Sequence, residues 1–325
     1  DPALCNILTM WSLQTSRTHF LASRGLAPLS RQGLATTIHF HHGDCLEGMG
    51  ELPAESVDLV VTSPPYNLGI DYRSYDDTSP RESFLAWCMD WGSEIHRVLR
   101  VDGSFFLNLG GSPSNPLLPH QLLLSLTTPK LFQLQNTFHW IKSISIETPA
   151  AKTISAGHSK PIHPKRYVND RHEYVFHLTK SGEFHLDRRA AVVPYADQSN
   201  IKRWKHTGGS DLRCRGNTWF IPYETIQSRK NQRPHPASFP PALVEQCIKL
   251  HGRREQTVLL DPFLGIGSSA VAAKKMDIES FVGFEIDEEY LEIARERLAG
   301  TATSAKLSPG APPDTEPELP LQPPH

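Results

Sequence analysis

Short apolar runs alternate along this chain with stretches in which apolar residues recur every three or four positions. The runs at 59–61, 104–110, 258–260 and 281–285 contain many β-branched or aromatic residues and do not alternate with polar ones. This pattern is typical of strands buried on both faces of a parallel sheet. The helical period is clearest at 84–98, where five apolar residues share one face: Phe84, Cys88, Trp91, Ile95 and Val98.

Further elements complete an α/β pattern. A capping box at 79–82, with Pro80 at the first helical position, predicts the start of the helix over 84–98. Two aromatic-rich runs, 138–142 and 173–178, predict an antiparallel strand pair at the edge of the sheet. Two further helices are predicted over 242–251 and 288–298. The fold class that follows is a doubly wound, mostly parallel sheet.

The apolar run at 59–61 leads into a turn with its own chemistry, Ser63-Pro64-Pro65-Tyr66. Ligands of open α/β sheets bind beyond the carboxyl ends of the strands, where this turn lies. Two prolines remove two backbone donors, which leaves nearby carbonyls free to accept hydrogen bonds, and Tyr66 offers a flat face for a planar base. The polar loop 67–77 follows directly and is expected to close over such a base. The alternative is that the two prolines merely end a strand.

A second strand, 258–260, is followed by a glycine-rich turn, and a third ends in an acid, Glu285. This is the nucleoside-binding layout of doubly wound sheets, because glycines admit a close ligand and the acid accepts hydrogen bonds from ribose hydroxyls. The turn carries no lysine for a phosphate. A nucleoside without phosphates, such as S-adenosylmethionine, therefore fits better than a triphosphate.

Together, the two turns resemble the motifs of the amino-group DNA methyltransferases, over roughly residues 38–298. The catalytic motif precedes the cofactor motif, which resembles the permuted β-type order, and the Ser-Pro-Pro-Tyr form resembles the cytosine-N4 branch. The resemblance implies a Rossmann-like S-adenosylmethionine-dependent fold, with Ser63, Pro64, Pro65 and Tyr66 as catalytic residues. The cofactor-binding residues that it implies are Asp44, Asp261, Pro262, Phe263, Gly265, Gly267, Ser268, Glu285 and His235. Asp44 could equally be a helix N-cap.

The permuted order makes a geometric prediction. The chain should begin its fold with the strand at 39–42, and this strand should lie beside the one at 281–284. The catalytic domain is then expected over 38–299. A leader over 1–37, which carries arginines and no acidic residue after Asp1, is either disordered or an organelle transit peptide. A Pro-rich tail over 300–325 is expected to be disordered.

A basic and aromatic segment separates the two motifs within a predicted target-recognition insert, 143–234. Its candidate contacts to double-stranded DNA are Lys202, Arg203, Lys205, Arg213 and Arg215, interleaved with Trp204, Trp219 and Tyr223. Basic side chains neutralise phosphates, and aromatic groups can fill the space left by an extruded base. The alternative is an ordinary solvated loop.

Composition narrows the remaining possibilities. The net charge is −2, so attraction to DNA must come from local patches. Five scattered cysteines without a C-x-x-C pair argue against a disulfide framework and a zinc site, and the histidines at 39–42 lack ligand spacing. No apolar run is long enough to span a membrane. We expect a cytoplasmic, nucleoid-associated bacterial protein, or an organellar one if the leader is a transit peptide.

The predicted activity is direct methyl transfer to the N4 amino group of cytosine in DNA. No Pro-Cys pair is present, so the cysteine nucleophile of carbon-5 cytosine methylation is missing. Adenine N6 is the nearest alternative target. Methylation of RNA or a protein amide, and an inactive DNA-binding module, are further alternatives. The sequence leaves open the recognition site, the oligomeric state and any cognate restriction endonuclease.

Overall fold

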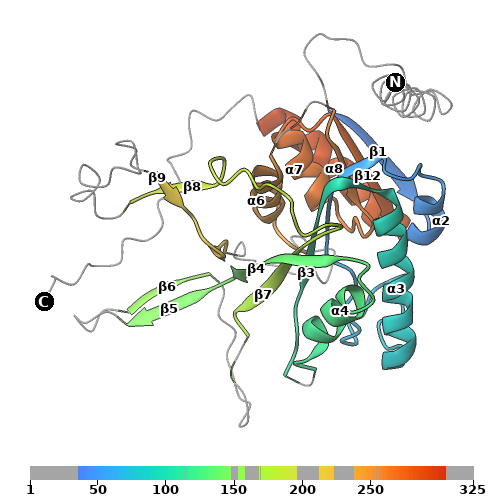
Figure 1. The fold of residues 1–325 in the computed structure, drawn as a ribbon, viewed down its shortest axis with the longest axis horizontal. Helices are drawn as coiled ribbons and strands as arrows, with labels where there is room; N and C mark the ends of the chain where they lie inside the picture. Colours follow the sequence, from blue (N-terminus) through green and yellow to red (C-terminus); the bar gives the residue numbers. More distant parts are fainter. Residues whose placement is uncertain are drawn as a thin grey trace, which may run out of the picture.

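An eight-stranded sheet in the order β1-β12-β11-β2-β3-β7-β4-β10 forms the centre of the computed structural model (Figure 1). The structure describes residues 36–113, 115–147, 153–157, 168, 170–195, 212–222, 238–252, 254 and 256–304. The strands of this sheet are β1 (Thr37–His42), β2 (Val57–Thr62), β3 (Leu99–Leu109), β4 (Gln133–Ile141), β7 (His172–Thr179), β10 (Thr218–Phe220), β11 (Val258–Asp261) and β12 (Ser280–Glu285). Within it, β7 alone runs antiparallel to its neighbours. The predicted doubly wound, mostly parallel sheet is confirmed.

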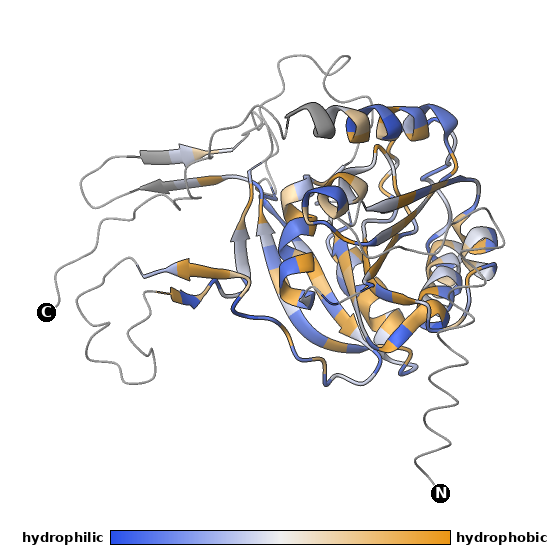
Figure 2. Cartoon of the chain, turned by 90° about the horizontal axis from the view of Figure 1, so that it is seen from above, coloured by the Kyte–Doolittle hydropathy of each residue, from blue (hydrophilic) through white to orange (hydrophobic). Residues whose placement is uncertain are grey.

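Helices cover both faces of the sheet. One face is covered by α2 (Cys45–Gly50), α3 (Arg81–Val98) and α4 (Leu118–Thr127), and the other by α6 (Pro241–His251), α7 (Ser268–Lys275) and α8 (Glu288–Ser304). Two apolar cores result, one on each side, and Figure 2 shows hydrophobic colour concentrated on the strands between them. The strand β2 is buried along its whole length, and its apolar residues contribute to both cores, Val57 and Val60 to one and Leu59 and Val61 to the other.

The amphipathic helix α3 buries the predicted stripe, including Phe84, Trp91 and Ile95. The predicted capping box is wrong. The helix begins at Arg81 with Pro80 as its N-cap and without a side-chain cap hydrogen bond. The backbone carbonyl of Ser79 instead accepts a hydrogen bond from Asn67 Nδ2 (2.8 Å), so this segment holds the loop that follows the catalytic turn.

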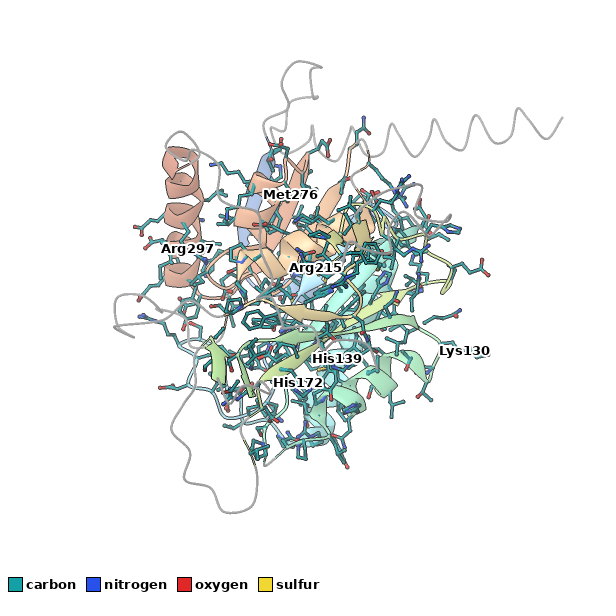
Figure 3. The ribbon with its side chains drawn as sticks, turned by 90° about the vertical axis from the view of Figure 1, so that its left-hand side faces the viewer. Lys130, His139, His172, Arg215, Met276 and Arg297 are labelled. Atoms are coloured by element: carbon teal, nitrogen blue, oxygen red, sulfur yellow. The ribbon has the colours of Figure 1, made fainter. Side chains whose placement is uncertain are left out.

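The antiparallel pair β4 and β7 is confirmed, with His139 opposite Tyr174. Figure 3 labels His139 and His172 on these adjacent strands, with ring centroids 5.9 Å apart. The pair is not the edge of the sheet, because β10 from the predicted insert adds a parallel strand outside β4. Trp219 in β10 is buried and stacks on Phe138 at 4.3 Å between ring centroids. This tryptophan is therefore a core residue rather than a DNA-contacting one.

The strand β1 pairs with β12 in parallel register, with Ile38 opposite Phe281 and His42 opposite Glu285. The predicted neighbourhood of the first and last strands is confirmed. The strand β1 begins at Thr37, so it takes in the last residue of the predicted leader. Helix α8 continues to Ser304, and the predicted tail thus starts within the last turns of this helix.

Two short antiparallel ribbons project from the end of the sheet that carries β4 and β10 (Figures 1 and 2). The first consists of β5 (Ile144–Glu147) and β6 (Thr153–Ala156). The second consists of β8 (Val192–Pro194) and β9 (Leu212–Cys214). Both ribbons belong to the predicted insert, which also contributes the sheet strands β7 and β10.

Two buried histidines lie on the α6 side of the sheet. His251 stacks on Phe184 at 5.1 Å between ring centroids, and within the described part of the chain neither of its ring nitrogens has a hydrogen-bond partner. His177 lies between Ser104 Oγ (3.1 Å from Nε2) and Asn136 Nδ2 (3.2 Å from Nδ1). Burial lowers the pKa of each histidine to about 3. In the unfolded chain each would take up a proton near pH 6.5.

Acid should therefore destabilise the fold through these histidines. The unfolded chain binds more protons than the folded one between pH 6.5 and 3, so each histidine costs about 1.4 kcal/mol of unfolding free energy per pH unit as the pH falls through this window. Asp261, whose pKa burial raises to about 6, opposes this trend between about pH 4 and 6. As the pH falls from 6.5 to 5, the unfolding free energy of His251→Leu should rise by about 2 kcal/mol relative to that of the unsubstituted protein. Urea unfolding at several pH values measures this difference.

Cys247→Ala in the same helix is the matched control for that measurement. The Cys247 thiol is buried, and burial raises its pKa, so it stays protonated throughout this range. This variant should lose a similar amount of stability at each pH. A stability difference between His251→Leu and the unsubstituted protein that does not change with pH would contradict the prediction.

Candidate active site

The sheet changes winding direction between β11 and β2. From β11 the next strand in the chain, β12, lies toward the edge formed by β1, whereas from β2 the next strand, β3, lies toward the other edge. The two strands are parallel neighbours, with Leu259 opposite Leu59 and Leu260 opposite Val60. The turns that follow them leave the same edge side by side, at the point where open α/β sheets bind their ligands.

A pocket lies at this edge and brings both predicted motifs together. Its lining includes all four predicted catalytic residues, Ser63, Pro64, Pro65 and Tyr66. It also includes six of the predicted cofactor residues: Asp44, Pro262, Phe263, Gly265, Ser268 and Glu285. Residues separated by about two hundred positions thus form one cavity.

A hydrogen-bond network fixes the catalytic turn. The Ser63 and Tyr66 hydroxyls lie 2.7 Å apart, and Tyr66 Oη also donates toward the Asn108 carbonyl (3.1 Å) and Glu173 Oε2 (3.3 Å). Asn108 Nδ2 lies 2.7 Å from Glu173 Oε2 and 2.8 Å from Tyr66 Oη. The Glu173 carboxylate is in turn ion-paired with Lys142 Nζ (2.8 Å). Each member therefore restrains the rotamer of the next.

This network leaves Ser63 able to accept a hydrogen bond. A hydroxyl has one donor and two acceptor positions. If Ser63 donates to Tyr66, its oxygen retains both acceptor positions, and Asn108 Nδ2 is its more distant neighbour at 3.3 Å. The Asn108 amide group has two hydrogens and two closer acceptors, so it need not occupy Ser63. The Ser63 oxygen can thus receive an amino hydrogen from a ligand.

Asn108, Lys142 and Glu173 are site residues that the sequence analysis missed, and Trp140 is a fourth. Asn108, Trp140 and Glu173 line the pocket. Lys142 lies 5.9 Å from the centroid of the Trp140 ring and anchors Glu173. Their positions in the sequence could have indicated Asn108 and Glu173, because Asn108 lies near the end of a predicted buried strand and Glu173 begins another. Polar residues at such strand ends are candidates for a site.

The opposite end of the pocket has the character of a nucleoside site. Glu285 Oε2 accepts a hydrogen bond from the Gly265 backbone N–H (2.7 Å), and Oε1 accepts one from Asp287 (3.0 Å). Gly265 adopts a positive φ of 52°, which favours glycine in this turn. Burial raises the pKa of Glu285. Ile286 is also at the pocket and is 37% exposed, so it offers an apolar surface for a purine ring.

Asp44 is the N-cap of α2 and also lines the pocket. Its side chain caps α2, since Oδ1 accepts a hydrogen bond from the Leu46 N–H at 2.7 Å. The same residue lines the pocket. A carboxylate has further acceptor positions, so capping leaves Asp44 able to contact a ligand.

Two predicted cofactor residues do not line the pocket. The Asp261 side chain is completely buried behind the turn and binds Thr62 and Ser269. Gly267 has a positive φ of 77°, and a Cβ atom there would lie 2.8 Å from the Ala294 Cβ of α8. Both residues shape the turn from the protein side. In Figure 3, Arg297 marks α8, from which it donates to the Ile266 carbonyl of this turn (2.5 Å).

The loop over 67–77 is tied to the cofactor end of the pocket, and its expected closure over a base stays a prediction. The buried Asp77 carboxylate accepts backbone hydrogen bonds from Asn67 and Leu68 (2.7 and 2.9 Å), which folds the loop. Ser74 donates to Asp287 (2.7 Å), and Arg73 pairs with Glu289. Tyr72 and Tyr75 from this loop line the pocket.

Two of the five predicted DNA-contacting residues are among those that the structure describes. Lys202, Arg203 and Lys205 lie outside the described residues, as does His235 of the predicted cofactor set. Ser238 and Phe239, which follow His235, do line the pocket. Arg213 lies in β9 and Arg215 directly after it, on the projecting ribbon and not in the pocket lining.

Two further properties concern the described part of the chain. It contains no group of three or more histidine, cysteine, aspartate or glutamate side chains that could hold a metal ion. Among its helices, none is long and apolar enough to cross a membrane.

The sheet and pocket define the class: a Rossmann-like methyltransferase fold with a nucleoside end and a catalytic end. Residues 57–296 match the N6_N4_Mtase family of DNA methylases, and the chain belongs to this family. A type II methyltransferase, M.ScaI of Streptomyces caespitosus, is 32% identical over 275 residues, which are 81% of this chain and 82% of that protein. The DNA adenine methyltransferase YhdJ of Escherichia coli K12 is 27% identical, covering 79% and 81%. The solved PvuII DNA methyltransferase, cytosine-N4-specific, superposes with a TM-score of 0.58 at 19% identity, covering 84% and 95%.

Family membership makes the protein a DNA methyltransferase whose cofactor is S-adenosyl-L-methionine. The side chains that line the pocket fit S-adenosyl-L-methionine. The acids Glu285 and Asp44 can accept hydrogen bonds from ribose hydroxyls and an adenine amino group. Phe263 and Ile286 supply apolar surface. Among the described residues, the pocket lining contains neither lysine nor arginine, in agreement with a ligand without phosphates.

Proposed function

We propose that the protein methylates the exocyclic N4 amino group of cytosine in double-stranded DNA, at a base extruded from the duplex into the catalytic end of the pocket. The observation that carries this proposal is the Ser63 hydroxyl, which lines the pocket and keeps acceptor positions for an amino group. An extruded base is needed because the amino group is otherwise paired within the duplex.

Methyl transfer requires the protein mainly to align the amino nitrogen of the base with the methyl group. The amino nitrogen of cytosine is a weak nucleophile, because its lone pair is delocalised into the ring. Hydrogen bonds from this amino group to Ser63 Oγ and the Pro64 carbonyl would favour a tetrahedral nitrogen and orient its lone pair. S-adenosylmethionine supplies an electrophilic methyl group. Such positioning and electrostatic effects need no covalent enzyme intermediate.

Adenine N6 is the second candidate target. The family includes methylases of both kinds, and YhdJ, 27% identical, is named as an adenine methyltransferase. Adenine and cytosine both present an amino group beside a ring nitrogen, so the acceptor pair at Ser63 and Pro64 could hold either. Preference for cytosine rests on the serine at position 63 in place of an aspartate.

Nucleoside mass spectrometry separates these outcomes. The full chain would be expressed in a host without DNA methylation of its own, beside the Ser63→Ala variant as the inactive reference. We expect 4-methylcytosine in DNA from cells with the unsubstituted protein only. Methylated adenine would replace the cytosine proposal by the adenine one. Methylated nucleosides in RNA alone, or none in DNA, would refute both.

We infer further that the basic segment of the insert contacts DNA. Alanine at Lys202, Arg203, Arg213 and Arg215 should weaken DNA binding and leave the dissociation constant for S-adenosylmethionine unchanged. Each lost phosphate contact should lower the salt slope of log affinity by about one unit, whereas a lost base contact should cost roughly 1–3 kcal/mol at the recognition site alone. Titrations of specific and unrelated duplexes across a salt series measure both.

A control variant removes four exposed charges from outside the insert, none of which lines the pocket: Arg100, Lys130, Lys275 and Arg295. It changes the net charge equally and should leave the salt slope nearly intact. If the insert variant retains its DNA affinity and slope while cofactor binding falls, the insert is not the DNA-contacting element.

A further inference from the structure

The Asp261 carboxylate is completely buried and accepts hydrogen bonds from both motif segments. Its Oδ1 atom accepts from Thr62 Oγ1 (2.6 Å) and from the Phe263 backbone N–H (3.1 Å). Its Oδ2 atom accepts from Ser269 Oγ (2.5 Å). Thr62 immediately precedes the catalytic Ser63. Phe263 and Ser269 lie on either side of the glycine turn. One side chain thus links the two halves of the active site.

This link continues the sheet beyond its last paired residues. The register pairs of β2 and β11 end at Val60 and Leu260. Beyond these residues the two strands lead toward the pocket, and the hydrogen bond between the Thr62 and Asp261 side chains is the next contact between them. It spans 199 positions of sequence. The separation between Ser63 and Phe263, which face the two ends of the pocket, therefore depends on it.

The same contacts argue against direct cofactor binding by Asp261. The residue is 0% exposed and does not line the pocket. Both acceptor positions of Oδ1 are filled, and Oδ2 is directed at α7 through Ser269. One acceptor position of Oδ2 stays open, but the carboxylate has no exposed surface at which a ligand could reach it.

We propose that Asp261 is a positioning residue that sets the distance between the catalytic turn and the cofactor turn. The proposal rests on the proposed methyl transfer and assigns this residue a role in the turnover number and not in cofactor affinity. Methyl transfer requires the two reacting groups to be held in line, and a misplacement of about 1 Å can cost about 100-fold in rate. A carboxylate held by three donors provides such a fixed connection.

The test compares substitutions on both sides of the link. Thr62→Val removes only the donor from the catalytic strand and should lower kcat roughly 10- to 100-fold at saturating cofactor. The dissociation constant for S-adenosylmethionine should stay within about twofold. Asp261→Asn should retain most of the activity, because its amide oxygen can still accept from Thr62 and Phe263 while the Ser269 hydroxyl turns to accept from its NH₂ group.

Thr257→Val is the matched control. Thr257 is equally buried and lies just before β11, at the opposite end of the strand from the pocket. Its substitution should affect stability without lowering kcat. Asp261→Ala completes the set. Combined with Thr62→Val, it should be no slower than Asp261→Ala alone, because both remove the same link.

Two results would overturn the inference while the proposed function stands. One is an active Thr62→Val variant with unchanged kcat. The other is weaker cofactor binding by Thr62→Val and Asp261→Asn with kcat retained at saturating cofactor, which would make Asp261 a cofactor residue. If Asp261→Ala does not fold, the Thr62→Val result alone decides. Absence of DNA methylation by the unsubstituted protein would instead refute the proposed function, and the inference with it.

Discussion

Replacing Ser63 by alanine should lower the turnover number for DNA methylation by about 100-fold or more. The variant loses the hydroxyl that we expect to accept an amino hydrogen of the target base, an interaction that strengthens as the nitrogen becomes tetrahedral. Loss of one such preorganised contact in an active site typically costs 100- to 1000-fold in rate. Cofactor affinity should change less than about twofold, because the Glu285 end of the pocket is untouched. Single-turnover assays and cofactor titration measure the two quantities separately.

Ser93→Ala is the control for that substitution. Ser93 lies on the exposed side of α3, where its hydroxyl donates to the Met89 carbonyl (2.8 Å). Its loss should leave turnover unchanged. If Ser63→Ala retains full turnover, the base-binding role of this turn is refuted, whichever base is methylated.

Replacing Glu285 by alanine should weaken binding of S-adenosylmethionine by roughly 10- to 100-fold. Hydrogen bonds to a charged group contribute about 1.5–3 kcal/mol, and the variant loses both the expected bonds from ribose and the bonds that hold Gly265 and Asp287. Since burial raises the pKa of Glu285, cofactor affinity of the unsubstituted protein should fall as the pH decreases through that raised value. Calorimetric titration at several pH values measures both effects.

Glu288→Ala is the matched control for the cofactor measurement. This glutamate is three residues further along, is half exposed, and pairs with His42 and Arg295 at the surface. Its loss removes the same charge without touching the pocket. Unchanged affinity in Glu285→Ala, or an equal loss in Glu288→Ala, would contradict the role of Glu285.

The sequence was sufficient for the elements whose physical signal is local. Apolar runs buried on both faces identified β2, β11 and β12, and the polar residues at their ends identified both turns of the pocket. The strands and turns required only periodicity and the rule that ligands bind at the carboxyl ends of strands. The position of β1 beside β12 came instead from the motif order that the chain shares with the permuted methyltransferases.

Residues whose role depends on register could not be predicted in the same way. Asn108 and Glu173 meet only because β3 and β7 pair with Asn108 opposite Val175. Asp261 occupies a motif position that looks like a ligand contact, yet its side chain turns away from the pocket toward Thr62. Trp219 belongs to a basic, aromatic segment, but β10 places it in the core. In each case a tertiary neighbour decides the role.

The pairing of β1 with β12 also determines when the protein can become active during its synthesis. Because Thr37 pairs opposite Ser280, the first strand has no sheet neighbour until nearly the whole domain has left the ribosome. Contacts so distant in sequence form slowly, and exposed strands are prone to association while they wait. The glycine turn and Glu285 are also made late. A nascent chain therefore carries its catalytic turn long before it can bind a methyl donor, and methylation can begin only once the segment up to Glu285 has been synthesised.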